Sequence, residues 1–349
     1  MNSEDVDEKF EESFDLYEHH NIVVDLGQAP LRIDKFLFNK IVNVTRNKIQ
    51  QAAKAGNIVV NNFPVKSNYK VKPLDEISVL MTYPPRDVKI LPEDIPIDIV
   101  YEDNDLILIN KQAGLVVHPG YANYTGTLLN GLAHYFDTTE QTNVENGFGY
   151  LVHRIDKDTT GLLLITKNEL AQTKLAKQFF DHTIEREYEA LVWRDVENDE
   201  GIIEGNIGRS LKDRRVMTVF PNGEYGKEAV SHYKVLKRFG YVTLVQCKLE
   251  TGRTHQIRAH LSFLGHPLFN DERYGGNTIL KGTTFTKYKQ FVQNCFKLLN
   301  RQALHARSLG FIHPTTNEKM YFESNLPSDF INVLEKWDSY TSHRSDDEK

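Results

Sequence analysis

Charged side chains at the ends of apolar segments are the part of this 349-residue chain that could carry chemistry. Asp156 is the most unusual of them, because it follows Arg154 by two positions and precedes the apolar run Leu162–Ile165. Three further segments place polar residues beside an apolar pattern. They are TIEREYEALV with Arg186 and Tyr188, ETGRTHQIRAHL with Arg253 and Arg258, and ALHARSLGFIHP with His305 and Arg307.

These residue types complement one another. A carboxylate beside an apolar strand is costly unless it is paired, and an arginine can pair with it in bidentate geometry. Held ionised in a dry pocket, the carboxylate can act as a nucleophile or base. A tyrosine adds a flat ring for stacking and a hydroxyl for proton transfer, and further arginines suit phosphates. Each group alone is more often a surface salt bridge or a core tyrosine, but together they favour chemistry on a nucleotide.

Motifs for nucleotides, cofactors and metals do not account for these residues. No segment matches the G-x-x-x-x-G-K-[ST] phosphate loop, and Gly147 and Gly149 lack the third glycine of a dinucleotide loop. The HRID segment has its aspartate one position later than the kinase H-R-D loop. His153 and Asp156 have no third metal ligand at a useful spacing. We therefore expect a reaction without metal or cofactor.

Composition indicates a soluble globular protein, with 40% hydrophobic and 26% charged residues. The two cysteines, Cys247 and Cys295, are far apart, which argues against a disulfide scaffold and fits a reducing compartment. The acidic N-terminus has no apolar core of a signal peptide, and no run approaches the roughly 18 apolar residues of a membrane span. We expect a cytoplasmic protein without membrane contact.

The net charge of −6 is unevenly distributed along the chain. Residues 1–20 hold eight acidic residues and one basic residue, a net of −7, whereas residues 31–80 hold nine Lys/Arg against three Asp/Glu, a net of +6. An acidic tail beside a basic module suggests a binding face for nucleic acid, which the net charge of the whole chain conceals. A solvated, lysine-rich surface explains the same charges equally well.

The elements that must position these residues fall into two groups. Residues 31–41 and 45–56 have helical spacing, with Thr45 as N-cap and Gly56 as the stop, and two strands around Asn61-Asn62 and a further strand follow. A proline-rich linker separates this module from a mixed α+β region. There, residues 254–265 predict a helix capped by Thr254 and ended by Gly265, so that Thr254 and Arg258 share a face.

Several of these segments resemble those of a known protein family. HRIDKDTTGLLLITKN is similar to H-R-L-D-x-x-T-S-G-L-L-L-x-A-K of the RluA/RluD-type pseudouridine synthases, with Ile155, Thr160 and Thr166 as mild differences. REYEALV, ETGRTHQIRAHL, DERYGG and LHARSLGFIHP resemble the family in the same order, and INKQAGLVVHPG does so with Gln112 where proline is usual. The likeness spans about residues 95–330. Residues 31–80 separately resemble the S-four-type RNA-binding domain.

The resemblance implies an α+β fold. It is a pseudouridine synthase fold with a central mixed, mainly antiparallel sheet flanked by helices and loops, preceded by the small α+β RNA-binding domain. The expected boundaries are an acidic, disordered segment 1–28, the RNA-binding domain 29–82, a linker 83–95, the catalytic domain 96–335 and a C-terminal tail 336–349.

The resemblance also implies a reaction and roles for the residues. Uridine in RNA is isomerised to its C-glycoside, with Asp156 as the catalytic aspartate, Tyr188 packed on the base as a candidate for proton abstraction, and Arg258 pairing with Asp156. Arg154 corresponds to the residue that helps extrude the base, and Leu304 to the apolar lining of its pocket. The residues expected to contact RNA are Arg32, Lys35, Arg46, Lys48, Lys54, Arg253 and His305.

The substrate and two competing functions stay open. Large-subunit ribosomal RNA, or a ribosome assembly intermediate, is the best match to the two-domain layout, and transfer RNA is the alternative. A non-catalytic RNA-binding or ribosome-assembly protein would not need Asp156, Tyr188 and Arg258. A nucleotide or glycoside hydrolase would need a second carboxylate, for which Asp158 is the near candidate. We expect a monomer.

Overall fold

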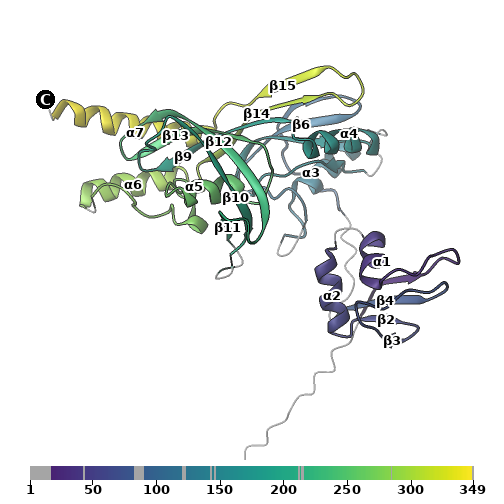
Figure 1. Cartoon of the computed structure of the whole chain (residues 1–349). Helices are drawn as coiled ribbons and strands as arrows, with labels where there is room; N and C mark the ends of the chain where they lie inside the picture. The colour runs from purple at the N-terminus through teal and green to yellow at the C-terminus, as the bar shows by residue number, and fades with distance from the viewer. Residues whose placement is uncertain are drawn as a thin grey trace, which may run out of the picture. The chain divides into compact units, whose positions relative to one another are not determined.

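The computed structural model of the chain describes residues 17–41, 44–81, 90–119, 123–141, 144, 147–210, 213, 216–283 and 285–347 (Figure 1). It divides into two compact units, Met1–Val88 and Lys89–Lys349. Most of the segment expected to be disordered, residues 1–16, lies outside the described residues, and so do residues 83–89 of the expected linker and residue 82 before it. No helix within the described ranges is long and apolar enough to cross a membrane.

The first unit is a small α+β module in which two helices pack on an antiparallel sheet of order β1-β4-β2-β3. Its elements are β1 (Tyr17–Val23), α1 (Ile33–Lys40), α2 (Arg46–Lys54), β2 (Ile58–Val60), β3 (Phe63–Pro64) and β4 (Glu76–Met81). The Thr45 hydroxyl accepts a hydrogen bond from the Lys48 N–H, so the expected cap is present. Asn61 and Asn62 both have left-handed φ angles, 49° and 69°, as a two-residue hairpin turn requires.

Strand β1 differs from the expectation that residues 1–28 are disordered. It pairs antiparallel with β4, from Tyr17 opposite Met81 to Val23 opposite Glu76, with an irregularity between Glu18 and His20. Residues 17–23 therefore form a strand because they pair with a backbone segment more than 50 residues away. Their own hydrophobic pattern is irregular and does not reveal this pairing.

The second unit is built on one long mixed sheet of order β11-β10-β12-β13-β9-β14-β8-β6-β5, with β15 on β14 and β7 on β8. This arrangement confirms the expected α+β class. The strands are β5 (Ile99–Glu102), β6 (Leu106–Lys111), β7 (Tyr150–Leu151), β8 (Thr160–Thr166), β9 (Glu185–Trp193), β10 (Glu200–Arg209), β11 (Met217–Phe220), β12 (Lys227–Arg238), β13 (Val242–Leu249), β14 (Leu304–Ile312) and β15 (Lys319–Glu323). The helices are α3 (Leu128–Thr138), α4 (Glu169–Phe180), α5 (Gln256–Phe263), the 3₁₀ turn η1 (Glu272–Tyr274), α6 (Thr286–Leu298) and α7 (Ser328–Asp347).

Both faces of the central strands are buried, which explains the continuous apolar run in β8. Leu163 and Ile165 pack with α3, whereas Leu162 and Leu164 pack on the opposite face with Leu175 of α4. Strand β9 is divided in the same way. Its Tyr188, Ala190 and Val192 pack toward α5, and Leu191 and Trp193 pack against α6 and α7. The alternation in β9 thus turns Tyr188 to the side of the sheet that carries α5.

Gly161 marks a close approach between β8 and β14. The two strands pair in parallel through His305 with Thr160 and Ala306 with Gly161. Gly161 has a φ of 108°, and a β-carbon there would collide with the backbone of Ala306. Only glycine fits at this point, five residues after Asp156.

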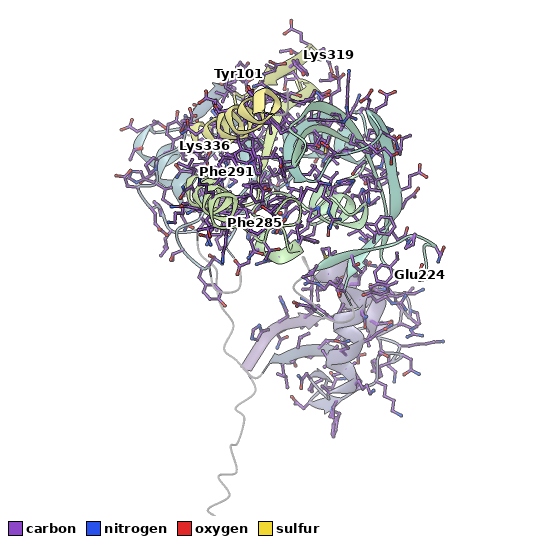
Figure 2. All side chains as sticks on the ribbon, turned by 90° about the vertical axis from the view of Figure 1, so that its left-hand side faces the viewer. Tyr101, Glu224, Phe285, Phe291, Lys319 and Lys336 are labelled. Carbon is purple, nitrogen blue, oxygen red and sulfur yellow. The ribbon has the colours of Figure 1, made fainter. Side chains whose placement is uncertain are left out.

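The C-terminal helix differs from the expected tail at residues 336–349. Helix α7 continues to Asp347, and Trp337 is completely buried against Trp193, Phe269 and Phe291. Helix α7, which carries Lys336, lies beside helix α6, which carries Phe291 (Figure 2). The polar side chains around Trp337 conceal its contribution to the core when the sequence is considered alone.

Candidate active site

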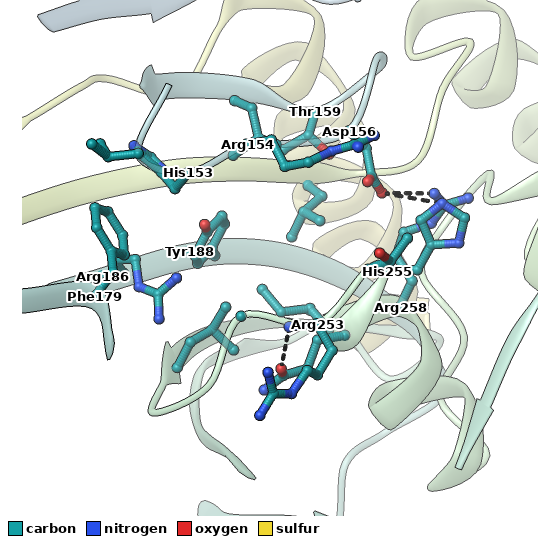
Figure 3. Close-up of a pocket in the computed structure, with 18 of the residues that line it drawn as sticks. His153, Arg154, Asp156, Thr159, Phe179, Arg186, Tyr188, Arg253, His255 and Arg258 are labelled. Carbon is teal, nitrogen blue, oxygen red and sulfur yellow. Dashed lines mark hydrogen bonds and ion pairs between the residues drawn. The ribbon is translucent and has the colours of Figure 1, made fainter. Parts of the chain in front are cut away.

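The four segments selected from the sequence meet around one pocket in the second unit, with a volume of about 480 Å³ (Figure 3). The turn before β8 contributes Asp156, the beginning of β9 contributes Arg186 and Tyr188, the approach to α5 contributes Arg253, and β14 contributes only Leu304. The sheet order brings β9, β14 and β8 side by side, although they are far apart in the chain. The fold thereby assembles these polar groups on one concave surface.

Asp156 and Arg258 form an ion pair at one end of this pocket. The Arg258 Nη1 donates to Asp156 Oδ2 at 2.8 Å, across 102 positions of sequence. The Arg258 side chain is only 6% exposed, whereas that of Asp156 is 22% exposed and faces the cavity. The pairing expected between these two distant segments is present in the structure.

Asp271 holds the other edge of the Arg258 guanidinium, a role that was not among the predictions from the sequence. Its oxygens accept from Arg258 Nε at 2.7 Å and Nη2 at 2.9 Å, and its side chain is fully buried. Burial alone would lower the pKa of Arg258, but the hydrogen bonds and charge of Asp271, with the charge of Asp156, raise it. Asp271 also caps η1 through the Arg273 and Tyr274 N–H groups. Its position in DERYGG, as a cap residue, was the available signal.

The beginning of helix α5 corrects the expected role of Thr254. The helix begins at Gln256, and the residue before it, His255, has a left-handed φ of 54°. The Gln256 side chain accepts from the Thr251 hydroxyl and the Arg253 N–H and donates to the Val230 carbonyl. These contacts fix the start of the helix from within, so a threonine cap is not used.

The left-handed conformation of His255 brings its ring to the Asp156 carboxylate. Its Nε2 lies 3.9 Å from Asp156 Oδ2, and its Nδ1 lies 3.2 Å from the Tyr274 hydroxyl. Burial lowers the pKa of His255, an effect that the charge of Asp156 only partly opposes. The imidazole is therefore neutral near pH 7 and adds a polar edge to the site without a second positive charge.

Tyr188 and Leu304 form the apolar part of the pocket. They are 7% and 5% exposed, and both line the cavity beside Asp156. Burial raises the pKa of Tyr188, and the charges of Arg186 and Asp156 act in opposite directions on it. The phenol therefore stays protonated at neutral pH, so its ring suits stacking on a planar group better than its hydroxyl suits direct proton abstraction.

Arg154 and Arg253 lie on the pocket wall at more open positions. Arg154 is exposed, and Arg253 is half-buried and donates from Nε to the Glu228 carbonyl at 2.8 Å. Both can reach a ligand without losing an ion pair among the described residues.

His305 corrects the expectation of an RNA contact. It is 1% exposed on β14, its Nε2 donates to the Ser324 carbonyl, and its Nδ1 accepts from the Thr160 hydroxyl at 2.9 Å. Both ring nitrogens are thus used between β14, β8 and the segment after β15. The sequence places His305 next to Leu304 in the motif, but strand alternation turns it away from the pocket.

The expected RNA-binding residues of the first unit divide into two kinds. Arg32 and Arg46 both donate to the fully buried Asp34, yet each side chain stays about two-fifths exposed, at 41% and 42%. Burial would raise the pKa of Asp34, but hydrogen bonds from Arg32, Gln50 and Arg46 hold it well below its usual range. Lys35, Lys48 and Lys54 are exposed.

Metal-ligand geometry is limited to one group in the described part of the chain, formed by Asp103, Asp105 and His313. Asp103 accepts from the Asp105 and Leu106 N–H groups, the Tyr101 hydroxyl and His313. These hydrogen bonds account for the cluster without a metal, and none of its three members lines the pocket.

Known proteins that resemble this chain include RNA pseudouridine synthases and S4 domains. A family described as RNA pseudouridylate synthase matches residues 105–263, and an S4 domain matches residues 31–77. An "Uncharacterized RNA pseudouridine synthase" of Chlorobaculum parvum is 47% identical over 314 residues, covering 88% of this chain and 94% of the relative. A "Ribosomal large subunit pseudouridine synthase D" of Neisseria meningitidis is 38% identical, covering 90% and 80%. The solved human RNA Pseudouridylate Synthase Domain Containing 4 has the same fold, with a TM-score of 0.53 and 23% identity over 69% of this chain and 92% of its own.

Arg258→Met is expected to destabilise the protein by about 3–5 kcal/mol, because it leaves the buried Asp271 carboxylate without its counter-charge. Urea unfolding measures this loss. Asp156→Asn should cost much less, since Arg258 keeps its bond to Asp271, and Arg258→Met/Asp271→Asn should recover part of the loss. Equal stabilities of Arg258→Met and Asp156→Asn would contradict the anchoring role of Asp271.

His305→Gln is expected to flatten the acid side of the stability profile. Burial lowers the pKa of His305 from 6.5 to about 4, so the unfolded chain binds this proton more tightly. The contribution of the neutral ring is therefore complete above pH 6.5 and is lost as the pH falls to about 4, a change of about 3 kcal/mol. Urea unfolding between pH 7 and pH 4 should show the wild-type and variant curves converging; parallel curves would refute this.

Proposed function

The chain belongs to the RNA pseudouridylate synthase family, with an N-terminal S4 domain, and on this premise we propose that it isomerises uridines of large-subunit ribosomal RNA with Asp156 as nucleophile. Its activity as an RNA pseudouridine synthase follows from the family and its relatives. The proposal concerns the RNA that is modified and the residues that carry out the reaction.

The observation that carries the assignment of Asp156 is the chain of charges from Asp271 through Arg258 to Asp156. Asp271 fixes two nitrogens of the guanidinium, so Nη1 is presented to Asp156 in one orientation. A carboxylate that is aimed in this way and only 22% exposed keeps a free oxygen for the cavity. Such an oriented, partly desolvated carboxylate is suited to covalent catalysis.

The reaction assigns a separate task to each part of the pocket. The glycosidic bond of uridine breaks, the uracil turns in place, and its carbon 5 bonds to the sugar, so no atom is gained or lost. Asp156 attacks the anomeric carbon or assists elimination to a glycal. Tyr188 stacks on the uracil and Leu304 borders it, while Arg154 at the open side helps extrude the nucleotide from its stack.

Ribosomal RNA is favoured as substrate by two features. The relative of Neisseria meningitidis that is named for the large ribosomal subunit aligns with 90% of this chain, across both of its units. Residues 31–80, which contain the S4 match, carry a net charge of +6, which suits a structured RNA. Transfer RNA is the alternative substrate. Mapping the pseudouridines in both kinds of RNA distinguishes the two.

A strain that carries Asp156→Asn should lack the same pseudouridines as a strain without the protein, because the amide cannot act as a nucleophile. Pseudouridine mapping of ribosomal and transfer RNA is the measurement. The purified variant should remain folded, bind RNA and release no tritium from carbon-5-labelled uridine.

Asp158→Asn is the matched control and should retain the modifications, since Asp158 does not line the pocket. Turnover by Asp156→Asn would exclude the nucleophile. Missing sites confined to transfer RNA would exclude the ribosomal substrate.

Replacement of Lys35, Lys48 and Lys54 by glutamine is expected to weaken binding to structured RNA and to reduce its salt dependence, by up to ~0.9 in the logarithmic slope for each lost phosphate contact. Titrations between 50 and 200 mM salt test this. Turnover of a short RNA that holds only the target loop should not change. An unaltered salt slope would exclude these lysines from the RNA interface.

A further inference from the structure

Arg186 is a buried cation whose guanidinium has no hydrogen-bond or carboxylate partner among the described residues. It is 7% exposed, its Nε is buried and unsatisfied, and none of its side-chain donors makes a hydrogen bond or ion pair there. Arginine has five N–H donors, and buried arginines are normally paired. Burial lowers the pKa of Arg186, although the guanidinium remains charged at neutral pH.

The surroundings of Arg186 hold it in place without neutralising it. Its guanidinium carbon lies 5.2 Å from the centre of the Phe179 ring, and a β-carbon on Gly252 would be only 3.0 Å from Nη1. A glycine at position 252 therefore leaves room for the guanidinium beside the backbone. Arg186 is thus packed in a defined position with its hydrogen-bonding capacity unused.

Arg186 lines the same pocket as Asp156, on the other side of Tyr188 (Figure 3). Because Arg186 and Tyr188 are two positions apart in β9, they project from the same face of the strand. A nucleotide with its sugar at Asp156 and its base on Tyr188 therefore has Arg186 within the cavity it enters.

His153 contributes a second unsatisfied donor to this end of the pocket. Its ring stacks on Phe179 at 4.8 Å, and its Nε2 accepts from the Leu164 N–H at 2.9 Å. The neutral ring must then carry its hydrogen on Nδ1, which is buried and has no partner in the described structure. Burial and the charge of Arg186 lower the pKa of His153 to about 3, so it supplies a donor and no charge.

The unpaired charge indicates which ligand fits. A buried cation without a counter-ion weakens folding, and an anion that enters the pocket removes this cost. A neutral uracil carbonyl would satisfy one donor but leave the charge uncompensated. A phosphodiester offers two oxygens in the geometry that matches a guanidinium, and every nucleotide of RNA carries one.

We propose that Arg186 binds a phosphodiester group of the RNA next to the target uridine, as an anion subsite of the pocket. This inference rests on the proposed function, because it assumes that the target nucleotide occupies the cavity beside Asp156. The subsite fixes the RNA backbone on one side of Tyr188 while Asp156 acts on the other.

Single methylphosphonate substitutions, which remove the charge of one phosphate, test this subsite. They are placed one at a time around the target uridine in a ribosomal stem-loop that the wild-type enzyme isomerises. One position should lower the wild-type kcat/KM on the order of tenfold, as expected for one lost charged contact. Arg186→Met should lower kcat/KM on unmodified RNA by a similar factor. Methylphosphonate at the sensitive position should then cause no further loss in this variant. The slope of its log binding constant against log salt concentration should be smaller in magnitude by ~0.7–0.9.

Lys248→Met is the matched control, since it removes one charge from an exposed position of β13 outside the pocket and should keep the methylphosphonate sensitivity. Thermal melting separates binding from structure. Arg186→Met should melt at least roughly 2 °C higher than the wild type, because an uncompensated buried charge is removed. A lower melting temperature would show a structural role and overturn the inference.

Two outcomes separate the subsite from the proposed function. Wild-type turnover with no methylphosphonate position coupled to Arg186, or coupling instead to 2-thio- or 4-thiouridine at the target, overturns the subsite alone. A wild-type enzyme inactive on every ribosomal fragment overturns the proposed substrate. In that case the anion subsite is tested with inorganic phosphate, compared with chloride at equal ionic strength. Phosphate should raise the melting temperature of the wild type and not that of Arg186→Met.

Discussion

The site depends on one buried guanidinium shared between two carboxylates. Arg258 is bonded on two nitrogens to Asp271, which is fully buried, and on the third to Asp156, which faces the pocket. A buried arginine with one partner would be a weak anchor, because removing charges from water is costly. With Asp271 as a permanent counter-charge, Arg258 can hold Asp156 in place while the cavity beside that carboxylate fills and empties. The chemistry of the proposed nucleophile thus relies on a residue that does not line the pocket.

The sequence was informative about this site where polar residues interrupt apolar patterns. Asp156 stood out because it precedes a buried strand, and Tyr188 because alternation places it on one face with Arg186. Asp271 could not be inferred in the same way, since a cap residue before a short turn has an adequate local explanation. His305 was assigned wrongly because a histidine within a motif can satisfy both nitrogens inside the core, and a sequence does not show which face it occupies.

The fold was predictable wherever local signals were consistent. The helices and hairpin of the first unit, with Thr45 as cap and a turn at Asn61-Asn62, follow from short-range patterns. Strand β1 and helix α7 depend on partners distant in sequence, β4 for the one and the aromatic cluster around Trp193 for the other. The start of α5 was misplaced because Gln256, rather than Thr254, satisfies the local backbone. Long-range pairing, rather than local propensity, accounts for these differences.

Gly161 has a mechanical consequence for the pocket. Because no side chain separates β8 from Ala306, the two backbones meet directly, and this crossing joins the turn that carries Asp156 to the strand that carries Leu304. Closely packed backbones resist shear, so this contact ties the turn with Asp156 to the pocket wall with Leu304. The opposite wall of the pocket is built differently, because Arg253 and the approach to α5 lie outside regular structure. The pocket thereby has one wall braced by direct backbone contact and another formed by a loop.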